Sequence, residues 1–171
     1  VRVLMALKRY EQADDVLRRS ITLHADFSLI KLRIEVLKHI NDPRRIIGVT
    51  GLGLGISISE DQGFLFFHQA DALYEMKQYE QAFTVYCLAL KNPPENKSRF
   101  INYRILKIHY ELGRIDELEQ GASILLGEFK DDDYVKEIMH FRFQPDFSLM
   151  SPSKTPERVQ RILHLRTSIL R

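Results

Sequence analysis

The stretch Tyr10-Glu11-Gln12-Ala13 returns letter for letter as Tyr79-Glu80-Gln81-Ala82 in this chain of 171 residues. The two copies begin 79 − 10 = 69 residues apart. Arrays of paired helices repeat with a period of about 34 residues, so the spacing is close to two periods. The repetition therefore predicts an array of similar units, with one further unit between the two copies.

Apolar residues around the second copy recur at helical spacing, and sustained strand-like alternation is scarce along the chain. One such stripe consists of Phe66, Ala70, Leu73, Tyr74 and Met76. Polar turns at residues 41–43, 77–78 and 112–114 separate segments that each have the length of a helix in a helical hairpin. These observations predict an all-α fold.

The segment from Gly63 to Pro94 resembles a whole tetratricopeptide repeat, or TPR. Small residues stand where the two helices of a repeat touch, large residues stand where they fill the groove between helices, and Gln69 departs from the family by replacing a typical Leu. Small side chains let two antiparallel helices approach closely, while large ones fill the remaining space. The matching positions are Phe66, Ala70, Leu73, Tyr79, Ala82, Tyr86, Ala89 and Pro94.

The resemblance implies an all-α, right-handed superhelical stack of antiparallel helix hairpins, a TPR-like α-solenoid. We expect an array of about four units over residues 1–141, with the first unit truncated and the unit at residues 29–58 the most degenerate. Residues 142–154, which include Pro145 and Pro152, are expected to form an irregular linker. Thr155 and Pro156 are typical of a helix start, so residues 155–171 are expected to form a capping or connecting helix.

Composition narrows the classes of function. Lys and Arg number 25, Asp and Glu number 23, and the charges are interspersed, which argues against nucleic-acid binding. The single cysteine, Cys87, excludes an internal disulfide, and the sequence contains no apolar stretch long enough to span a membrane. We therefore expect a cytoplasmic protein without a membrane span, and the start at Val1 suggests a piece of a longer polypeptide.

No motif predicts catalysis, a cofactor or a metal site. The glycine-rich segment at residues 49–55 has Ile56 where a dinucleotide-binding loop needs its third glycine, and no Lys follows as in a phosphate loop. We expect a loosened second helix or loop there, the least stable part of the array, because each interior glycine costs a helix about 1 kcal/mol. The six histidines lack metal-ligand spacing, and Cys87 is expected to have a packing role.

In the family, the first helices of successive units line a concave groove. The matching positions in the third and fourth units are aromatic, basic and polar, and aromatic and Arg side chains are typical anchors of protein interfaces. The alternative is that these rings join adjacent repeats. The predicted groove residues are Phe64, Phe67, His68, Asp71, Tyr74, Phe100, Tyr103, Arg104, Lys107 and Tyr110.

The resemblance implies a non-catalytic scaffold that binds a segment of a partner protein in this groove. Arg104 and Lys107 favour a partner with some negative charge. Phe67 and Asp71 replace the Lys and Asn with which some TPR domains hold a terminal carboxylate, so chaperone tails are not the expected ligand. The alternative is an accessory TPR domain of a larger enzyme, such as a bacterial glycan-assembling transferase, and self-association of the stack is a further expectation.

Overall fold

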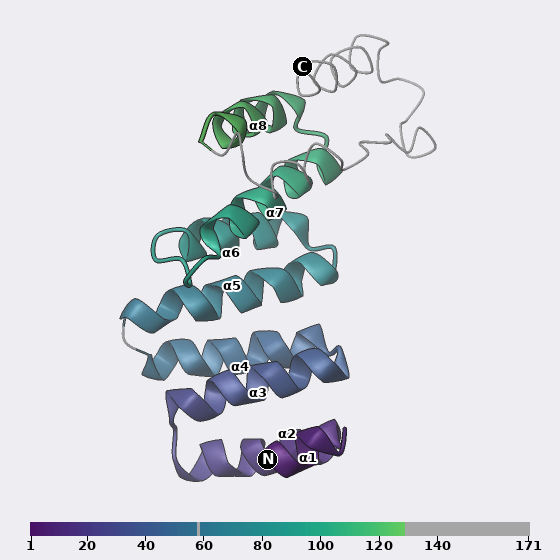
Figure 1. Ribbon diagram of the computed structural model, residues 1–171, viewed down its shortest axis with the longest axis vertical. Coiled ribbons are helices and arrows are strands. Elements are labelled where there is room, and N and C mark those ends of the chain that lie inside the picture. Colours follow the sequence, from purple (N-terminus) through teal and green to yellow (C-terminus); the bar gives the residue numbers. More distant parts are fainter. Residues whose placement is uncertain (58, 129–171) are drawn as a thin grey trace. The chain divides into compact units, whose positions relative to one another are not determined.

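The computed structural model describes residues 1–57 and 59–128, and every regular element among them is an α-helix (Figure 1). Short turns join these helices in pairs, which makes the two members of each pair antiparallel. The all-α fold of helix hairpins predicted from the sequence is confirmed for these residues. The pairs are α1 (Arg2–Ala6) with α2 (Tyr10–Leu23), α3 (Phe27–Ile40) with α4 (Pro43–Ile56), α5 (Ser59–Glu75) with α6 (Tyr79–Ala89), and α7 (Ser98–Glu111) with α8 (Ile115–Glu128).

One residue in each turn between paired helices has a left-handed backbone. The four are Lys8, Asn41, Lys77 and Gly113, with φ between 56° and 68°. They are 33, 36 and 36 residues apart (41 − 8, 77 − 41 and 113 − 77). A left-handed residue after a helix lets the following amides bond back to the last turn, which ends the helix and turns the chain. The separation of 69 residues between the two tetrapeptides therefore combines two unequal periods.

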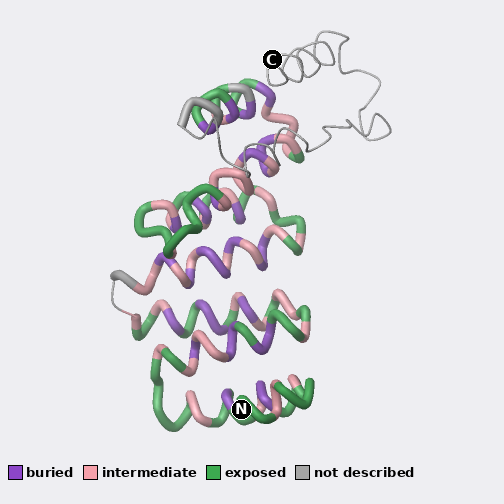
Figure 2. The backbone as a smooth tube through the Cα atoms, in the orientation of Figure 1, coloured by how far each residue is buried: buried purple, intermediate pink, exposed green. Residues whose placement is uncertain are grey.

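The chain divides into two compact units, which are described separately. The first unit, Val1–Ile101, contains three hairpins, and the second begins at Asn102. In the first unit α2 packs against α3 and α4 packs against α5, so that each hairpin lies on the next. Figure 2 shows that buried residues recur along these helices at helical intervals. Tyr10 and Tyr79 both begin second helices, as the repeat predicts.

Small residues bring α5 and α6 together. Ala70 of α5 and Ala82 and Ala89 of α6 are completely buried, beside the buried ring of Tyr86. Such residues allow the close approach of the two helix backbones. The hairpin is therefore held in the way that the sequence predicts.

The start of α5 meets the chain that follows α6. A Cβ atom added at Gly63 would lie 1.5 Å from the backbone oxygen of Asn92. No side chain fits such an approach, so glycine is required at this position. This contact fixes the loop after α6 against the first turns of α5.

Larger residues hold the α3–α4 hairpin. Its core includes Ile34 and Leu37 of α3 with Ile46 and Val49 of α4. The glycine-rich segment, expected to be a loosened helix or a loop, forms the second half of the regular helix α4. Gly53 is its buried glycine, and a Cβ added there would lie 2.8 Å from the Leu65 side chain of α5.

The start of α4 explains why this segment is helical. The Asp42 side chain accepts a hydrogen bond from the Arg45 backbone N–H, and Pro43 occupies the first turn. A capping carboxylate and an N-terminal proline are both favourable at a helix start. These features, together with the apolar stripe facing α3, outweigh the cost of the four glycines in α4.

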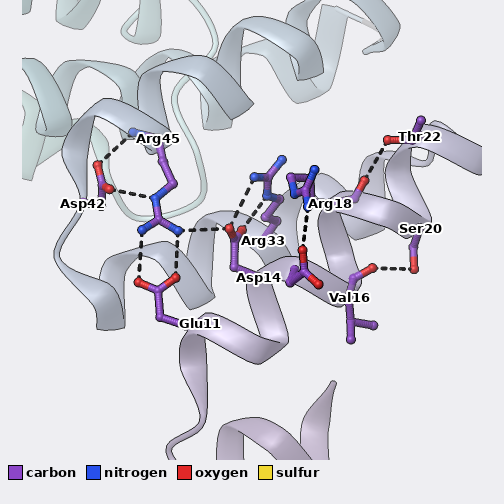
Figure 3. Close-up of polar contacts among 10 residues, drawn as sticks. Glu11, Asp14, Val16, Arg18, Ser20, Thr22, Arg33, Asp42 and Arg45 are labelled. Atoms are coloured by element: carbon purple, nitrogen blue, oxygen red, sulfur yellow. Dashed lines mark hydrogen bonds and ion pairs between the residues drawn. The ribbon is translucent and has the colours of Figure 1, made fainter.

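A network of ion pairs joins the first two hairpins (Figure 3). Asp14 of α2 accepts from Arg33 Nε of α3 at 2.6 Å, and both side chains are buried. Arg45 of α4 donates to both carboxylate oxygens of Glu11 and also to Asp14 at 3.2 Å. Buried charges need such partners, because an unpaired one is strongly destabilising. The pairs therefore fix α2 against both helices of the next hairpin.

In the second unit, α8 packs against the later part of α7. The cluster contains Leu106 of α7 with Ile115, Leu118 and Leu125 of α8. Leu118 stands where the family has a small residue, and a close approach occurs three residues later, where a Cβ at Gly121 would lie 2.6 Å from the Leu106 side chain. The small residue that permits the helix contact is thus Gly121, which lies later along α8 than the small residue of the family pattern.

Three predicted regions lie partly or wholly outside the described residues. These are the end of the array near residue 141, the linker at residues 142–154 and the helix at residues 155–171, all of which stay predictions. Within the part that the structure describes, no helix combines the length and apolar character needed to cross a membrane.

Candidate functional site

The first helices of the second and third hairpins are joined by a row of aromatic rings. Phe27 of α3 packs edge to face on Phe64 of α5, with ring centroids 6.3 Å apart. Phe64 in turn packs on the His68 imidazole one turn later, at 4.4 Å. Edge-to-face packing of this kind stabilises aromatic pairs beyond the area they bury. We call the surface along these helices the first-helix face.

The row continues towards α7. The Phe67 ring lies 5.0 Å from the His68 ring and 5.8 Å from the Phe100 ring, near the start of α7. Phe67 is only 5% exposed and His68 only 9%, whereas Phe27, Phe64 and Phe100 are half-buried. Phe67 and His68 therefore pack between the helices, and the three half-buried rings are the part of the row that solvent reaches.

Two lysines accompany the rings. The Lys31 ammonium lies 4.5 Å from the centroid of Phe27 and 5.5 Å from that of Phe64, and it pairs with Asp61 at 3.3 Å. Lys97, just before α7, lies 5.9 Å from the centroid of Phe67. Cations over aromatic faces are attracted by the ring quadrupole. The face thus combines apolar ring edges with charged side chains.

The imidazole at the centre of this row is neutral at physiological pH. Burial lowers the pKa of His68 to about 3, and the nearby ammonium groups of Lys38 and Lys97 act in the same direction. Lys38 is exposed near the end of α3, two helical turns after Lys31. His68 therefore packs as an uncharged ring.

Two further predicted residues of α5 have partners within their own hairpin. The Tyr86 hydroxyl of α6 donates a hydrogen bond to Asp71. The Tyr74 ring packs on Tyr79, with centroids 5.4 Å apart. Both side chains are half-buried, so each stabilises the hairpin while keeping part of its surface accessible.

The remaining predicted residues belong to the second unit. Tyr103 and Tyr110 pack against its apolar cluster and are half-buried. The Lys107 ammonium lies 5.7 Å from the centroid of Tyr103, and Arg104 is also half-buried. The structure thus groups Phe64, Phe67, His68 and Phe100 in the first unit, and Tyr103, Arg104, Lys107 and Tyr110 along one helix of the second.

Sequence reasoning missed Phe27, Lys31 and Lys38 of α3. The left-handed turn residues give the register that was missed. Asn41 corresponds to Lys77, so Lys31 corresponds to Phe67 and Lys38 corresponds to Tyr74. The second repeat, expected at residues 29–58, has its helices at residues 27–56, so the sequence analysis did not use this register. Lys97 was missed because it precedes the helix.

Cys87 and the metal-ligating side chains are the remaining residues that the sequence analysis considered for chemistry. Cys87 is exposed on α6, which corrects the packing role expected for it, and partial burial raises the pKa of its thiol, which disfavours the reactive thiolate. Within residues 1–57 and 59–128, no three His, Cys, Asp or Glu side chains are grouped so as to hold a metal ion.

Residues 65–96, which comprise most of α5, all of α6 and the loop after it, match the family described as tetratricopeptide repeat. This chain carries a tetratricopeptide repeat. The match coincides with the hairpin whose small residues and turn indicated the family from sequence. None of the curated proteins compared with the chain matches it. Tetratricopeptide repeats are in general non-catalytic modules that bind other proteins.

Proposed function

We propose that the chain is a non-catalytic scaffold that binds a segment of a partner protein along the first-helix face. The observation that carries the proposal is the row of half-buried rings, Phe27, Phe64 and Phe100, on neighbouring first helices. Rigid aromatic side chains supply large contact area at a low entropic cost, which is why they anchor protein interfaces. The tetratricopeptide repeat within the chain supports a protein partner.

The predicted site in the second unit is a further part of the proposal. Tyr103 and Lys107 form a cation–aromatic pair there, and Arg104 adds a second positive charge. A partner segment with acidic side chains would complement these charges. Replacing Tyr103, Arg104 and Lys107 by Ala should weaken capture of the partner while the helicity is retained.

The experiment uses the whole chain as bait for a library of random linear peptides displayed on phage. We expect enriched peptides whose affinity falls about tenfold when Phe64 is replaced by Ala, as for a central interface anchor. Lys31→Glu serves as a second variant if the first reduces helicity. Leu52→Ala is the matched control, because Leu52 is 58% exposed on α4 and lies outside the first-helix face.

Failure to enrich any peptide would overturn the proposal. Equal loss of binding in the control and the Phe64 variant would also contradict it, because the partner would then not recognise this face.

The alternative is an accessory tetratricopeptide domain of a larger enzyme, such as a glycan-assembling transferase. It requires the same binding surface and differs only in a catalytic domain elsewhere in the polypeptide, so the sequence of the whole gene distinguishes the two. Self-association and a cytoplasmic location also stay predictions. Sedimentation of the purified chain over a range of concentrations tests the first of these.

A further inference from the structure

One side of α1 is exposed and mostly apolar. Arg2, Val3, Ala6 and Leu7 are exposed, and their spacing places them on one side of the helix. Val3 is 71% exposed and Leu7 is 62% exposed, although both side chains are apolar. The other side of α1 packs on α2, in the layer at one end of the first unit (Figure 1). We call the exposed side, together with the next two residues of the turn, the end face.

The equivalent side of the first helix is covered by another helix in the next two hairpins. When the repeats are aligned on their left-handed turn residues, Val3 corresponds to Val36 of α3. Val36 is completely buried in a cluster with Ala13 and Leu17 of the preceding helix α2. Ala72 of α5 is the next counterpart, and it is buried in a cluster that includes residues of the preceding helix α4. In both junctions this side of a first helix therefore receives an α-helix.

The two apolar residues of the end face have the spacing of this junction. Leu7 corresponds to Ile40, which packs on the same cluster of α2 and α3 as Val36 does. Val3 and Leu7 are four residues apart, as Val36 and Ile40 are. Side chains at this spacing form a ridge that fits the groove of a neighbouring helix. The end face therefore has the form of a surface that receives a helix.

The end face is also basic. Arg2, Lys8 and Arg9 are exposed, and residues 1–10 contain no Asp or Glu. In the part of the chain that the structure describes, no carboxylate pairs with any of these three side chains. Their charges are thus available to an incoming group.

The carboxylates at the start of α2 are already engaged. Glu11 pairs with Arg45, and Asp14 pairs with Arg33. Asp15 pairs with two arginines of α2 itself. These acids therefore do not neutralise the end face, and a partner with negative charge would complement it.

We propose that the end face binds an amphipathic α-helix of a partner protein, whose apolar ridge packs on Val3 and Leu7. Acidic side chains beside that ridge pair with the three basic residues. The partner helix takes the place against α1 that α2 takes against α3. Exposed apolar patches with a polar rim are typical of protein interfaces. This surface is separate from the first-helix face, so the inference goes beyond the proposed function and does not depend on it.

The test uses the whole chain as bait for a phage library of helix-forming peptides. Each peptide carries a fixed ridge of Ala and Leu four residues apart, and the positions beside the ridge vary among Glu, Gln and Lys. The Kd of the tightest peptide is measured by fluorescence polarisation, for the peptide itself and for a copy with each Glu changed to Gln. The variants of the chain are the pair Val3→Ser, Leu7→Ser and the triple Arg2→Gln, Lys8→Gln, Arg9→Gln. Circular dichroism checks that each variant keeps its helicity.

We expect Glu to be enriched beside the ridge, and each of the two variants to bind the tightest peptide about tenfold more weakly. The Gln copy should bind the unchanged chain about as weakly, and it should lose nothing further with the triple variant. Two controls should keep full affinity. They are Leu52→Ser, which removes an exposed leucine of α4, and Phe64→Ala, which alters the first-helix face.

Failure to enrich any helix, or enrichment of Lys or Gln beside the ridge, would overturn this inference. Full affinity of the Val3→Ser, Leu7→Ser variant would also overturn it. Weaker binding by the Phe64 variant alone would place the helix on the first-helix face instead. Sedimentation adds a last outcome: a dimer that the Val3→Ser, Leu7→Ser variant dissociates would contradict the inference, because a second copy of the chain would then occupy the end face.

Discussion

The hairpins α3–α4 and α5–α6 share one architecture but are held together by different side chains. In α5–α6 the helices touch through Ala70, Ala82 and Ala89, as the family pattern predicts. In α3–α4 branched aliphatic residues fill the core, and Arg33 and Arg45 pair with carboxylates of α2. The two hairpins share their turn geometry and similar helix lengths, but the side chains that pack between their helices differ. The comparison teaches that the turn and the helix length define the repeated unit, whereas the packing residues can vary.

The largest expected effect tests the ion pairs that join α2 to the α3–α4 hairpin. Asp14→Ala leaves the buried Arg33 guanidinium without its carboxylate, so we expect the free energy of unfolding to fall by about 3 to 5 kcal/mol. Asp15→Ala is the matched control, because this neighbouring carboxylate pairs only at the surface. Urea denaturation measures both variants. An equal response of the two would show that the buried pair does not hold the hairpins together.

The next effect tests the close approach of Gly63 in α5 to the loop after α6. Gly63→Ala places a Cβ atom against the Asn92 carbonyl, and we expect a loss of about 3 kcal/mol because the backbone must move. Gly51→Ala of α4 is the control, since no atom lies within 4 Å of its added Cβ. That change should stabilise the helix by up to about 1 kcal/mol. A stable Gly63 variant would contradict the close approach.

A smaller effect reports on the aromatic row. The pKa of His68 is about 3 in the folded chain, below its ordinary value of 6.5, so the unfolded state binds the proton first as the pH falls. The contribution of the neutral His68 ring to stability is therefore fully present above pH 6.5 and is lost as the pH falls below it. Between pH 7 and pH 5.5 the free energy of unfolding should fall by about 1 kcal/mol.

Denaturation of His68→Phe at the two pH values should remove this difference. The exposed His24→Gln variant should retain it. A His68→Phe variant with the same pH response as the unchanged chain would contradict a buried neutral imidazole.

The smallest effect separates the second helices of the two hairpins. Four glycines in α4, against none in α6, predict that α4 amides exchange at least about tenfold faster than those of α6. Hydrogen exchange measures this, and Gly51→Ala with Gly55→Ala should slow it. Uniformly slow exchange from Gly48 to Ser57 in the unchanged chain would contradict the prediction.

Much of the fold could be predicted from the sequence because helical spacing and turn residues are local signals. The hairpin containing Ala70 and Ala82 was read correctly in detail. In α4, however, the glycines suggested a loosened segment, and the opposing signals were the Asp42 cap and the aliphatic residues that face α3. The ion pair between Glu11 and Arg45 joins residues 34 positions apart in different hairpins, which no local pattern indicates.

The candidate site was predicted in part. Phe64 and His68 lie one turn apart, so their common face followed from spacing alone. Spacing does not tell whether a ring on that face meets solvent or the next helix, and the burial of Phe67 came only from the structure. Lys31 and Lys38 needed the register of the second hairpin, which its degenerate sequence obscures.

The most direct test of the first-helix face is a cross-link from a chosen helix to the bound peptide. A photoreactive benzoylphenylalanine is introduced at Glu35, exposed on α3, or at Leu52, exposed on α4, and each chain is irradiated with the tightest selected peptide. The account predicts a cross-link from position 35 and none from position 52. A cross-link from position 52 alone would contradict it.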